Sequence, residues 1–187
     1  MSFTTEQLAL YRDTTVPDLI GDACRLLWVG INPGLWTAAT GTHFCHPTNR
    51  FYPALERAGI IDWVVDADIG LTDRQRADFV DKGMGISNLV ARATVRAAEL
   101  SAVELRDGGR RLQARIEALE PNIVAVAGVT AFRTAFGRPG AALGAQNETL
   151  GGAKVWAVPN PSGLNAHETI DSLSNWYRTV ALEAGAG

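Results

Sequence analysis

Two asparagine–proline loops are the features of this sequence best suited to chemistry. The first, GINPG at positions 30–34, follows an apolar run at 26–29, and the second, NPSG at 160–163, follows an apolar run at 155–158. Proline and glycine fix a loop backbone that is neither helix nor strand. Each asparagine, whose amide can both donate and accept hydrogen bonds, is therefore expected on the rigid support that an active site requires.

The elements around these loops predict the fold class. The runs at 26–30, 123–128 and 155–158 are typical of buried strands. Five helices are expected. The first runs from Arg50 to Ala58 after an Asn49 cap, the second from Asp73 to about Gly83, and the third from the Ser101/Glu104 capping box to Pro121. The fourth runs from the end of the 123–128 strand to Phe136, and the fifth from Glu168 to Leu182. Strands separated by helices predict an α/β fold, in which a central, mostly parallel sheet lies between two helical layers.

Two segments lack a clear pattern. Residues 31–48 form a long stretch rich in Gly, Pro, Thr and His, which we expect to be an irregular, functional loop. Residues 1–22 are polar, and we expect a loosely docked lead-in to a single domain that spans 1–187. In an open α/β sheet the ligand crevice lies beyond the carboxyl ends of the strands, where both asparagine–proline loops would meet.

Composition excludes several classes of protein. A chain of 187 residues with 47% apolar content suits one domain with a proper core, and no run is long enough to cross a membrane. The first residues lack a signal-peptide pattern, so a cytoplasmic protein is expected. We also expect the protein to be a monomer. Two cysteines are too few to hold an iron–sulfur cluster by thiolates alone. The net charge of −3 argues weakly against a nucleic-acid binder. A chain with this net charge can still carry a local basic face that binds nucleic acid.

Three separated motifs together resemble one family. GINPGL at 30–35, T-G-x-x-F-x-H-P-x-N-R-F across 40–51 and NPSGL at 160–164 are similar to the mismatch-specific uracil/thymine DNA glycosylases, and so are L-V-x-R at 89–92 and G-G-R at 108–110. The similarity extends from about residue 26 to the last helix. It implies a three-layer α/β/α domain of the uracil-DNA glycosylase type.

The resemblance assigns catalysis to Asn32. Its side-chain carbonyl would accept a hydrogen bond from water and orient that water toward the sugar of an extruded nucleotide. An amide has no useful basicity, so the contribution is positioning rather than proton abstraction. The alternative is that Asn32 only braces its loop; the three motifs together favour catalysis.

The resemblance also implies a base pocket. Phe44 would stack on the flipped base, Thr37 would crowd the C5 methyl of thymine, and Asn88 would either read the base or brace its segment. His43 matches a histidine of the thymine-excising members, but a solvated loop histidine is an equal alternative. The expected pocket comprises Gly30, Ile31, Pro33, Thr37, His43, Phe44 and Asn88.

A wedge that enters the duplex is expected from the second loop. An apolar side chain between base steps offsets part of the unstacking cost. The wedge segment comprises Asn160, Pro161, Ser162, Gly163, Leu164 and Asn165. The sequence departs from the family where 165–167 lack the expected Arg or Lys, where Trp36 is bulky, and where Asn88 replaces the basic residue of one branch.

The sequence therefore predicts a DNA glycosylase that hydrolyses the N-glycosidic bond of uracil, preferentially opposite guanine, with other damaged pyrimidines such as ethenocytosine as further candidate substrates. Its partner would be double-stranded DNA with uracil mismatches, with single-stranded DNA as a further candidate. No cofactor is implied, and no metal, because His43, Cys45 and His46 lack a fourth ligand at zinc spacing. The alternatives are a cluster-bearing uracil glycosylase, a nucleotide-binding module, and a silent protein that binds mismatches or abasic DNA.

Overall fold

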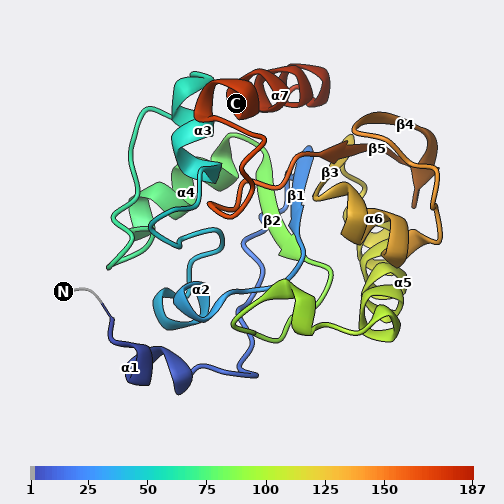
Figure 1. Ribbon diagram of the computed structural model, residues 1–187. Coiled ribbons are helices and arrows are strands. Elements are labelled where there is room, and N and C mark those ends of the chain that lie inside the picture. Colours follow the sequence, from blue (N-terminus) through green and yellow to red (C-terminus); the bar gives the residue numbers. More distant parts are fainter. Residues whose placement is uncertain (1–2) are drawn as a thin grey trace.

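A five-stranded sheet forms the centre of the computed structural model, which describes residues 3–187 (Figure 1). The strands lie in the order β2-β1-β3-β5-β4. Four of them are parallel, and β4 pairs with β5 in the antiparallel sense at one edge. The strands are β1 Leu26–Gly30, β2 Met84–Asn88, β3 Ile123–Ala127, β4 Gly144–Leu150 and β5 Ala153–Val158.

Helices cover both faces of this sheet (Figure 1). On one face lie α3 Phe51–Arg57, α4 Asp73–Asp81 and α7 Ile170–Ala184, and on the other lie α5 Ala102–Leu119 and α6 Val129–Phe136. Three shorter helices, α1 Thr5–Ala9, α2 Leu35–Thr40 and the 3-10 turn η1 Ala97–Glu99, lie in the connections. The expected three-layer α/β fold is confirmed.

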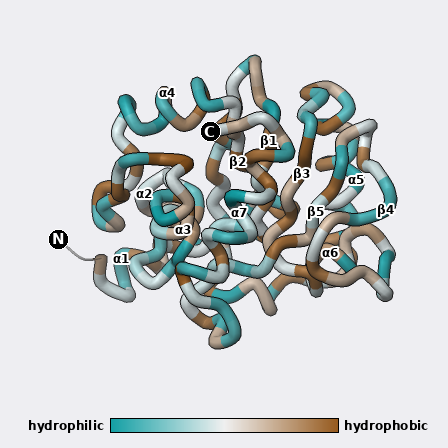
Figure 2. The backbone as a smooth tube through the Cα atoms, turned by 90° about the horizontal axis from the view of Figure 1, so that it is seen from above, coloured by the Kyte–Doolittle hydropathy of each residue, from teal (hydrophilic) through white to brown (hydrophobic). Residues whose placement is uncertain are grey.

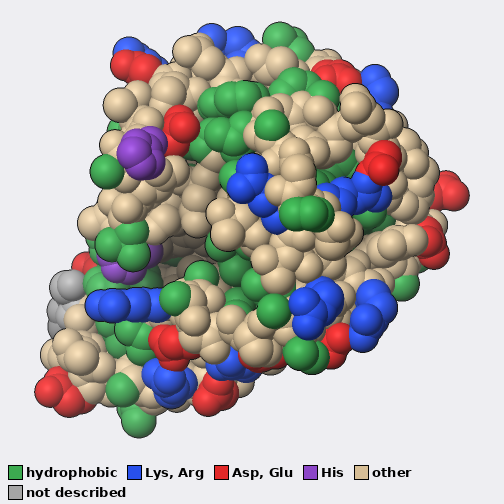
Figure 3. Space-filling model, turned by 45° about the vertical axis from the view of Figure 1, so that its right-hand side comes forward, with side chains coloured by type: hydrophobic (Ala, Val, Ile, Leu, Met, Phe, Trp, Pro, Cys, Tyr) green, Lys and Arg blue, Asp and Glu red, His purple; other side chains and the backbone are tan. Residues whose placement is uncertain are grey.

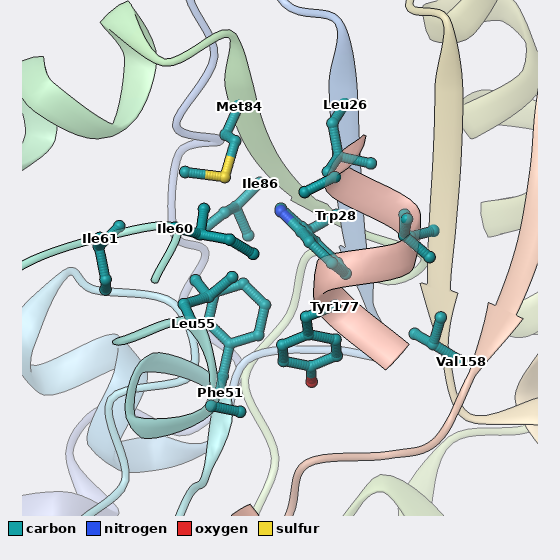
Figure 4. Close-up of a cluster of buried hydrophobic side chains, with 14 of the residues drawn as sticks. Leu26, Trp28, Phe51, Leu55, Ile60, Ile61, Met84, Ile86, Val158 and Tyr177 are labelled. Atoms are coloured by element: carbon teal, nitrogen blue, oxygen red, sulfur yellow. The ribbon is translucent and has the colours of Figure 1, made fainter. Parts of the chain in front are cut away.

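The two cores follow from side-chain alternation along the strands. In β1, Leu26 and Trp28 point to the α3/α7 side, whereas Leu27 and Val29 point to the α5/α6 side. All four are almost completely buried, because helices cover both faces of β1. A strand covered on both faces is apolar without interruption. Figure 4 shows Trp28 packed between the sheet and the side chains of α3 and α7. In Figure 2 the hydrophobic stretches gather along the central strands.

Several elements differ from the sequence-based expectations. The stretch 31–48 is not irregular throughout, because α2 occupies residues 35–40 and ends at Gly41, which has a positive φ of 61°. Strand β4 was not expected, since its exposed, polar residues show no apolar run. Helix α5 passes without a break through Gly108 and Gly109, where a Cβ would meet the carbonyl oxygens of Leu89 and Ala135 at 2.1 and 2.5 Å. These glycines allow close packing of α5 rather than weakening it.

Part of the expected N-terminal lead-in is paired with the body of the domain. Leu19 exchanges backbone hydrogen bonds with Ile86 of β2, and Thr15 bridges to Arg92. Val16 between them is buried. These contacts place residues 13–20 beside β2 and the segment that follows it.

The strand order places a ligand crevice at one edge of the sheet. The chain runs from β1 outward to β2 and then crosses back to β3 on the other side of β1, which makes a topological switch point between β1 and β3. The 30–34 loop leaves β1 at this point. A Cβ on Gly128, which follows β3, would lie 3.5 Å from Ile31 and 3.8 Å from Asn160. The carboxyl ends of β1, β3 and β5 thus bring both asparagine–proline loops together.

Candidate functional site

Asn32 is fixed by hydrogen bonds from the nitrogen of its side-chain amide. Nδ2 lies 3.0 Å from the carbonyl oxygens of both Pro33 and Arg92 and 2.8 Å from Thr94 Oγ1, so its two N–H groups are shared among three acceptors. Three acceptors around one end of the amide identify that end as the NH₂ group. The carbonyl Oδ1 therefore points the other way, and within residues 3–187 it has no hydrogen-bond partner. The half-buried side chain presents a free acceptor.

Thr94 is a part of this site that sequence reasoning missed. Its buried hydroxyl donates to Arg96 O at 2.9 Å, so the oxygen is left to accept from Asn32. Its backbone N–H also donates to Pro33 O at 3.1 Å. Thr94 is a positioning residue for Asn32, and the L-V-x-R motif two residues before it was the available signal.

Ionic contacts of Arg92 fix residues 92–94, the segment that carries Thr94. Arg92 donates to Glu104 of α5 at 2.6 Å and to Asp13 at 2.9 Å. The hydrogen bonds from Arg92 and Ser101 lower the pKa of Glu104 to about 2. The Arg92 carbonyl, an acceptor for Asn32, is thus tied to both α5 and the N-terminal segment.

Half-buried Asn88, at the end of β2, pairs with buried His43. His43 Nε2 lies 2.8 Å from Pro17 O, which can only accept, so Nε2 carries the proton. Nδ1 then accepts from Asn88 Nδ2 at 2.9 Å. This contact fixes the Asn88 amide with Oδ1 toward Gly30, where an added Cβ would lie 2.4 Å from that oxygen. His43 is 4% exposed, so it is not the solvated loop histidine that the sequence left open.

Phe44 lies against the same glycine. An added Cβ on Gly30 would be 3.1 Å from Phe44 Cζ, so only glycine allows the strand to approach this ring. One face of Phe44 stacks on Phe51 at a centroid distance of 4.2 Å and an angle of 25°. The backbone of Phe44 has a φ of +57°, a strained conformation of the kind that clusters at functional sites.

The other residues of the expected pocket are placed less directly. Ile31 is half-buried and Pro33 buried within the loop, and Thr37 is buried in α2. Trp36 donates from Nε1 to Ala67 O at 2.6 Å, so this large side chain braces the 66–70 turn. A hollow of about 130 Å³ lies beside Phe44 and is lined mainly by 44–56 and 64–67. Asn32 and Asn88 do not line it.

The second asparagine–proline loop is a compact turn with one protruding residue. Asn160 Oδ1 accepts from Ser162 N–H at 3.0 Å, and Asn165 Nδ2 donates to Asn160 O at 2.9 Å. These two amides are therefore used inside the loop. Leu164 is 88% exposed at its outer end, an unusual position for a large apolar side chain. Figure 3 shows a hollowed face with Lys and Arg side chains near its centre and along its lower part.

A comparison with known protein families decides the class of this chain. The family model described as "Uracil DNA glycosylase superfamily" matches residues 17–184, which include both loops, the Asn88 segment and the last helix. The chain belongs to the uracil DNA glycosylase superfamily. It is accordingly a DNA glycosylase, a hydrolase that acts on N-glycosidic bonds in DNA. The resemblance noted in the sequence is confirmed at this level.

Two further observations describe this glycosylase. Between residues 3 and 187 no group of three or more His, Cys, Asp or Glu side chains is arranged to hold a metal ion. Of the helices in the same range, none has both the length and the apolar composition needed to cross a membrane.

The glycosylase should lose stability in mild acid through His43. Burial, together with Arg76, lowers its pKa below the usual 6.5, against the opposing effects of Pro17 O and Asp18. The unfolded chain therefore binds more protons, so the free energy of unfolding is complete above the unfolded pKa and falls as pH decreases below it. Urea unfolding at about pH 7.5 and about pH 5 should show this loss in the wild type and a smaller loss in His43→Gln, which cannot titrate. Equal losses would contradict it.

Proposed function

We propose that this glycosylase hydrolyses the N-glycosidic bond of uracil in DNA, preferentially opposite guanine, by flipping the nucleotide and attacking it with a water held by Asn32. The observation that carries the proposal is the occupied NH₂ end of Asn32, which leaves Oδ1 to accept from a water. Such a water would be positioned without general-base catalysis, because an amide is not basic. The preference for guanine and the mismatch-specific branch rest on the motifs at 30–35, 40–51 and 160–164.

The pocket chemistry supports uracil as the base. Uracil presents an N3–H donor, and Asn88 Oδ1 is an acceptor whose direction is set by His43. A base entering beside Gly30 would stack on the face of Phe44 opposite Phe51. The remaining N–H of Asn88 could donate to a carbonyl of the departing base, where negative charge develops.

Substitution of Asn88 should change which uracil pairs are cleaved. Asn88→Lys removes the acceptor for N3–H, so we expect it to lose activity on A·U and single-stranded uracil more than on G·U. Asn88→Ala should lower the single-turnover rates on G·U, A·U and single-stranded uracil by about tenfold each. This is the cost of losing one hydrogen bond to a group on which charge develops. If both variants keep the wild-type rates and profile, Asn88 only braces its segment.

Thymine should be a poor substrate because of Thr37. Its β-branched side chain is buried in α2, directly after the catalytic loop, and we propose that it crowds the C5 methyl of thymine. Thr37→Ala should raise the G·T rate by about tenfold, in line with the 1–3 kcal/mol typical of one methyl-sized steric difference. Efficient G·T cleavage by the wild type, or no increase of the G·T rate in Thr37→Ala, would contradict the exclusion of thymine by Thr37.

One assay tests the proposed function. The protein is incubated with G·U, A·U, G·T and single-stranded uracil oligonucleotides, with and without EDTA, and abasic products are cleaved and separated. We expect G·U to be cleaved fastest and EDTA to have no effect. Binding of mismatched or abasic DNA without any cleavage would instead identify a silent binding protein, and activity abolished by EDTA and restored by zinc would contradict the metal-independent mechanism.

A further inference from the structure

Arg50 joins the two loops of the site. It precedes α3 and directly follows the segment that carries Phe44, and its backbone N–H donates to Pro161 O at 3.0 Å. One terminal nitrogen of its guanidinium donates to Ser162 O at 2.7 Å and to Asn165 O at 2.8 Å. The other terminal nitrogen donates to Glu168 O. Arg50 therefore contacts the second loop at four carbonyl groups.

The chemistry of arginine suits a brace of this kind. Residues 159–169 lie between β5 and α7 without regular structure, and ordering such a segment costs conformational entropy. A guanidinium presents its N–H groups in a rigid plane, so it fixes several acceptors relative to one another, whereas an ammonium acts as a single point charge. Hydrogen bonds from a charged donor are also stronger than neutral ones.

Thr48 also lies against this loop. A Cβ on Gly163 would lie 2.3 Å from Thr48 Oγ1 and 2.8 Å from Thr48 O, so the loop rests directly on this turn. Leu164, the next residue, projects outward and is 88% exposed. Arg50 and Thr48 thus both contact the loop that carries this side chain.

We propose that Arg50 is the positioning residue of the DNA-entering loop: by holding the carbonyls of Ser162, Asn165 and Glu168, it keeps Leu164 in the orientation that enters the duplex. The proposal rests on the proposed function, in which this loop is the wedge. Three of the five N–H groups of the Arg50 guanidinium donate to carbonyl oxygens of this loop, so its main contacts are with the loop itself.

The test compares Arg50→Met with Arg57→Met. Methionine keeps an apolar stem without donors. Arg57 is a matched control because it is the last residue of α3, the helix that Arg50 precedes, and it donates to exposed Asp171 instead of the loop. Backbone hydrogen exchange of peptides covering 160–169 is measured together with single-turnover rates on duplex and single-stranded uracil. Arg50→Lys, which keeps the charge but not the planar fork, serves as the second variant if Arg50→Met does not fold.

We expect Arg50→Met to speed exchange in 160–169 by at least about tenfold and to lower the duplex rate about tenfold more than the single-strand rate, with Arg50→Lys intermediate and Arg57→Met unchanged. Wild-type exchange and an unchanged duplex-to-single-strand ratio in the Arg50 variants would overturn the proposal. If the wild type cleaves no uracil, the proposed function fails, while the exchange measurement still decides whether Arg50 orders the loop.

Discussion

Asn32→Ala should lower the single-turnover rate of uracil excision by at least about 100-fold, the cost of losing the geometry of a reacting group. The variant lacks the only acceptor that we assign to the attacking water. In the proposed mechanism Asn32 holds the water and other residues bind the DNA, so affinity for the abasic product should stay close to that of the wild type. A fall in rate with retained product binding is the pattern of an interaction made with the reacting groups rather than with the bound DNA.

The same amide also braces its loop, so the experiment needs a control for folding. Asn122→Ala is a matched change, because Asn122 Nδ2 donates to Ala184 O at 2.9 Å, next to the amino end of β3 and away from the crevice. Both variants are compared with the wild type by thermal unfolding. If Asn32→Ala cleaves at the wild-type rate, Asn32 is a structural residue and the assignment of the water is wrong.

The features that could be predicted from the sequence are local ones. The apolar run at 26–30 and the Ser101/Glu104 capping box specify a strand and a helix start within a few residues, and both occur as expected. The asparagine–proline loops were predictable for the same reason, since proline and glycine limit the backbone wherever they stand. Parallel strands then bring loops that are distant in sequence to one edge of the sheet.

The contacts that orient the side chains could not be predicted in this way. Asn88 reaches His43 across 45 residues, Asn32 reaches Thr94 across 62, and Arg50 reaches Ser162 across 112. Such pairs depend on the final packing of layers, which no local pattern encodes. The sequence therefore pointed to an arginine within a family motif without showing that it holds the neighbouring loop.

The second large effect is expected at Leu164. An apolar side chain that enters the duplex offsets part of an unstacking cost of about a few kcal/mol, whereas a single strand has no base pair to open. Leu164→Ala should therefore lower the single-turnover rate on G·U duplex by about 10- to 100-fold and leave the rate on single-stranded uracil nearly unchanged. Because Leu164 is 88% exposed, its removal leaves no cavity and should not alter the free energy of unfolding.

Leu182→Ala provides the comparison for this prediction. Leu182 is another exposed leucine, 75% accessible, located near the end of α7 and away from the 159–169 loop. It should behave as the wild type on both substrates. Equal losses for Leu164→Ala on duplex and single-stranded DNA would mean that Leu164 supports the loop or the fold. A selective loss on the duplex would instead place the unstacking step at this residue, because the two substrates share every contact with the flipped base.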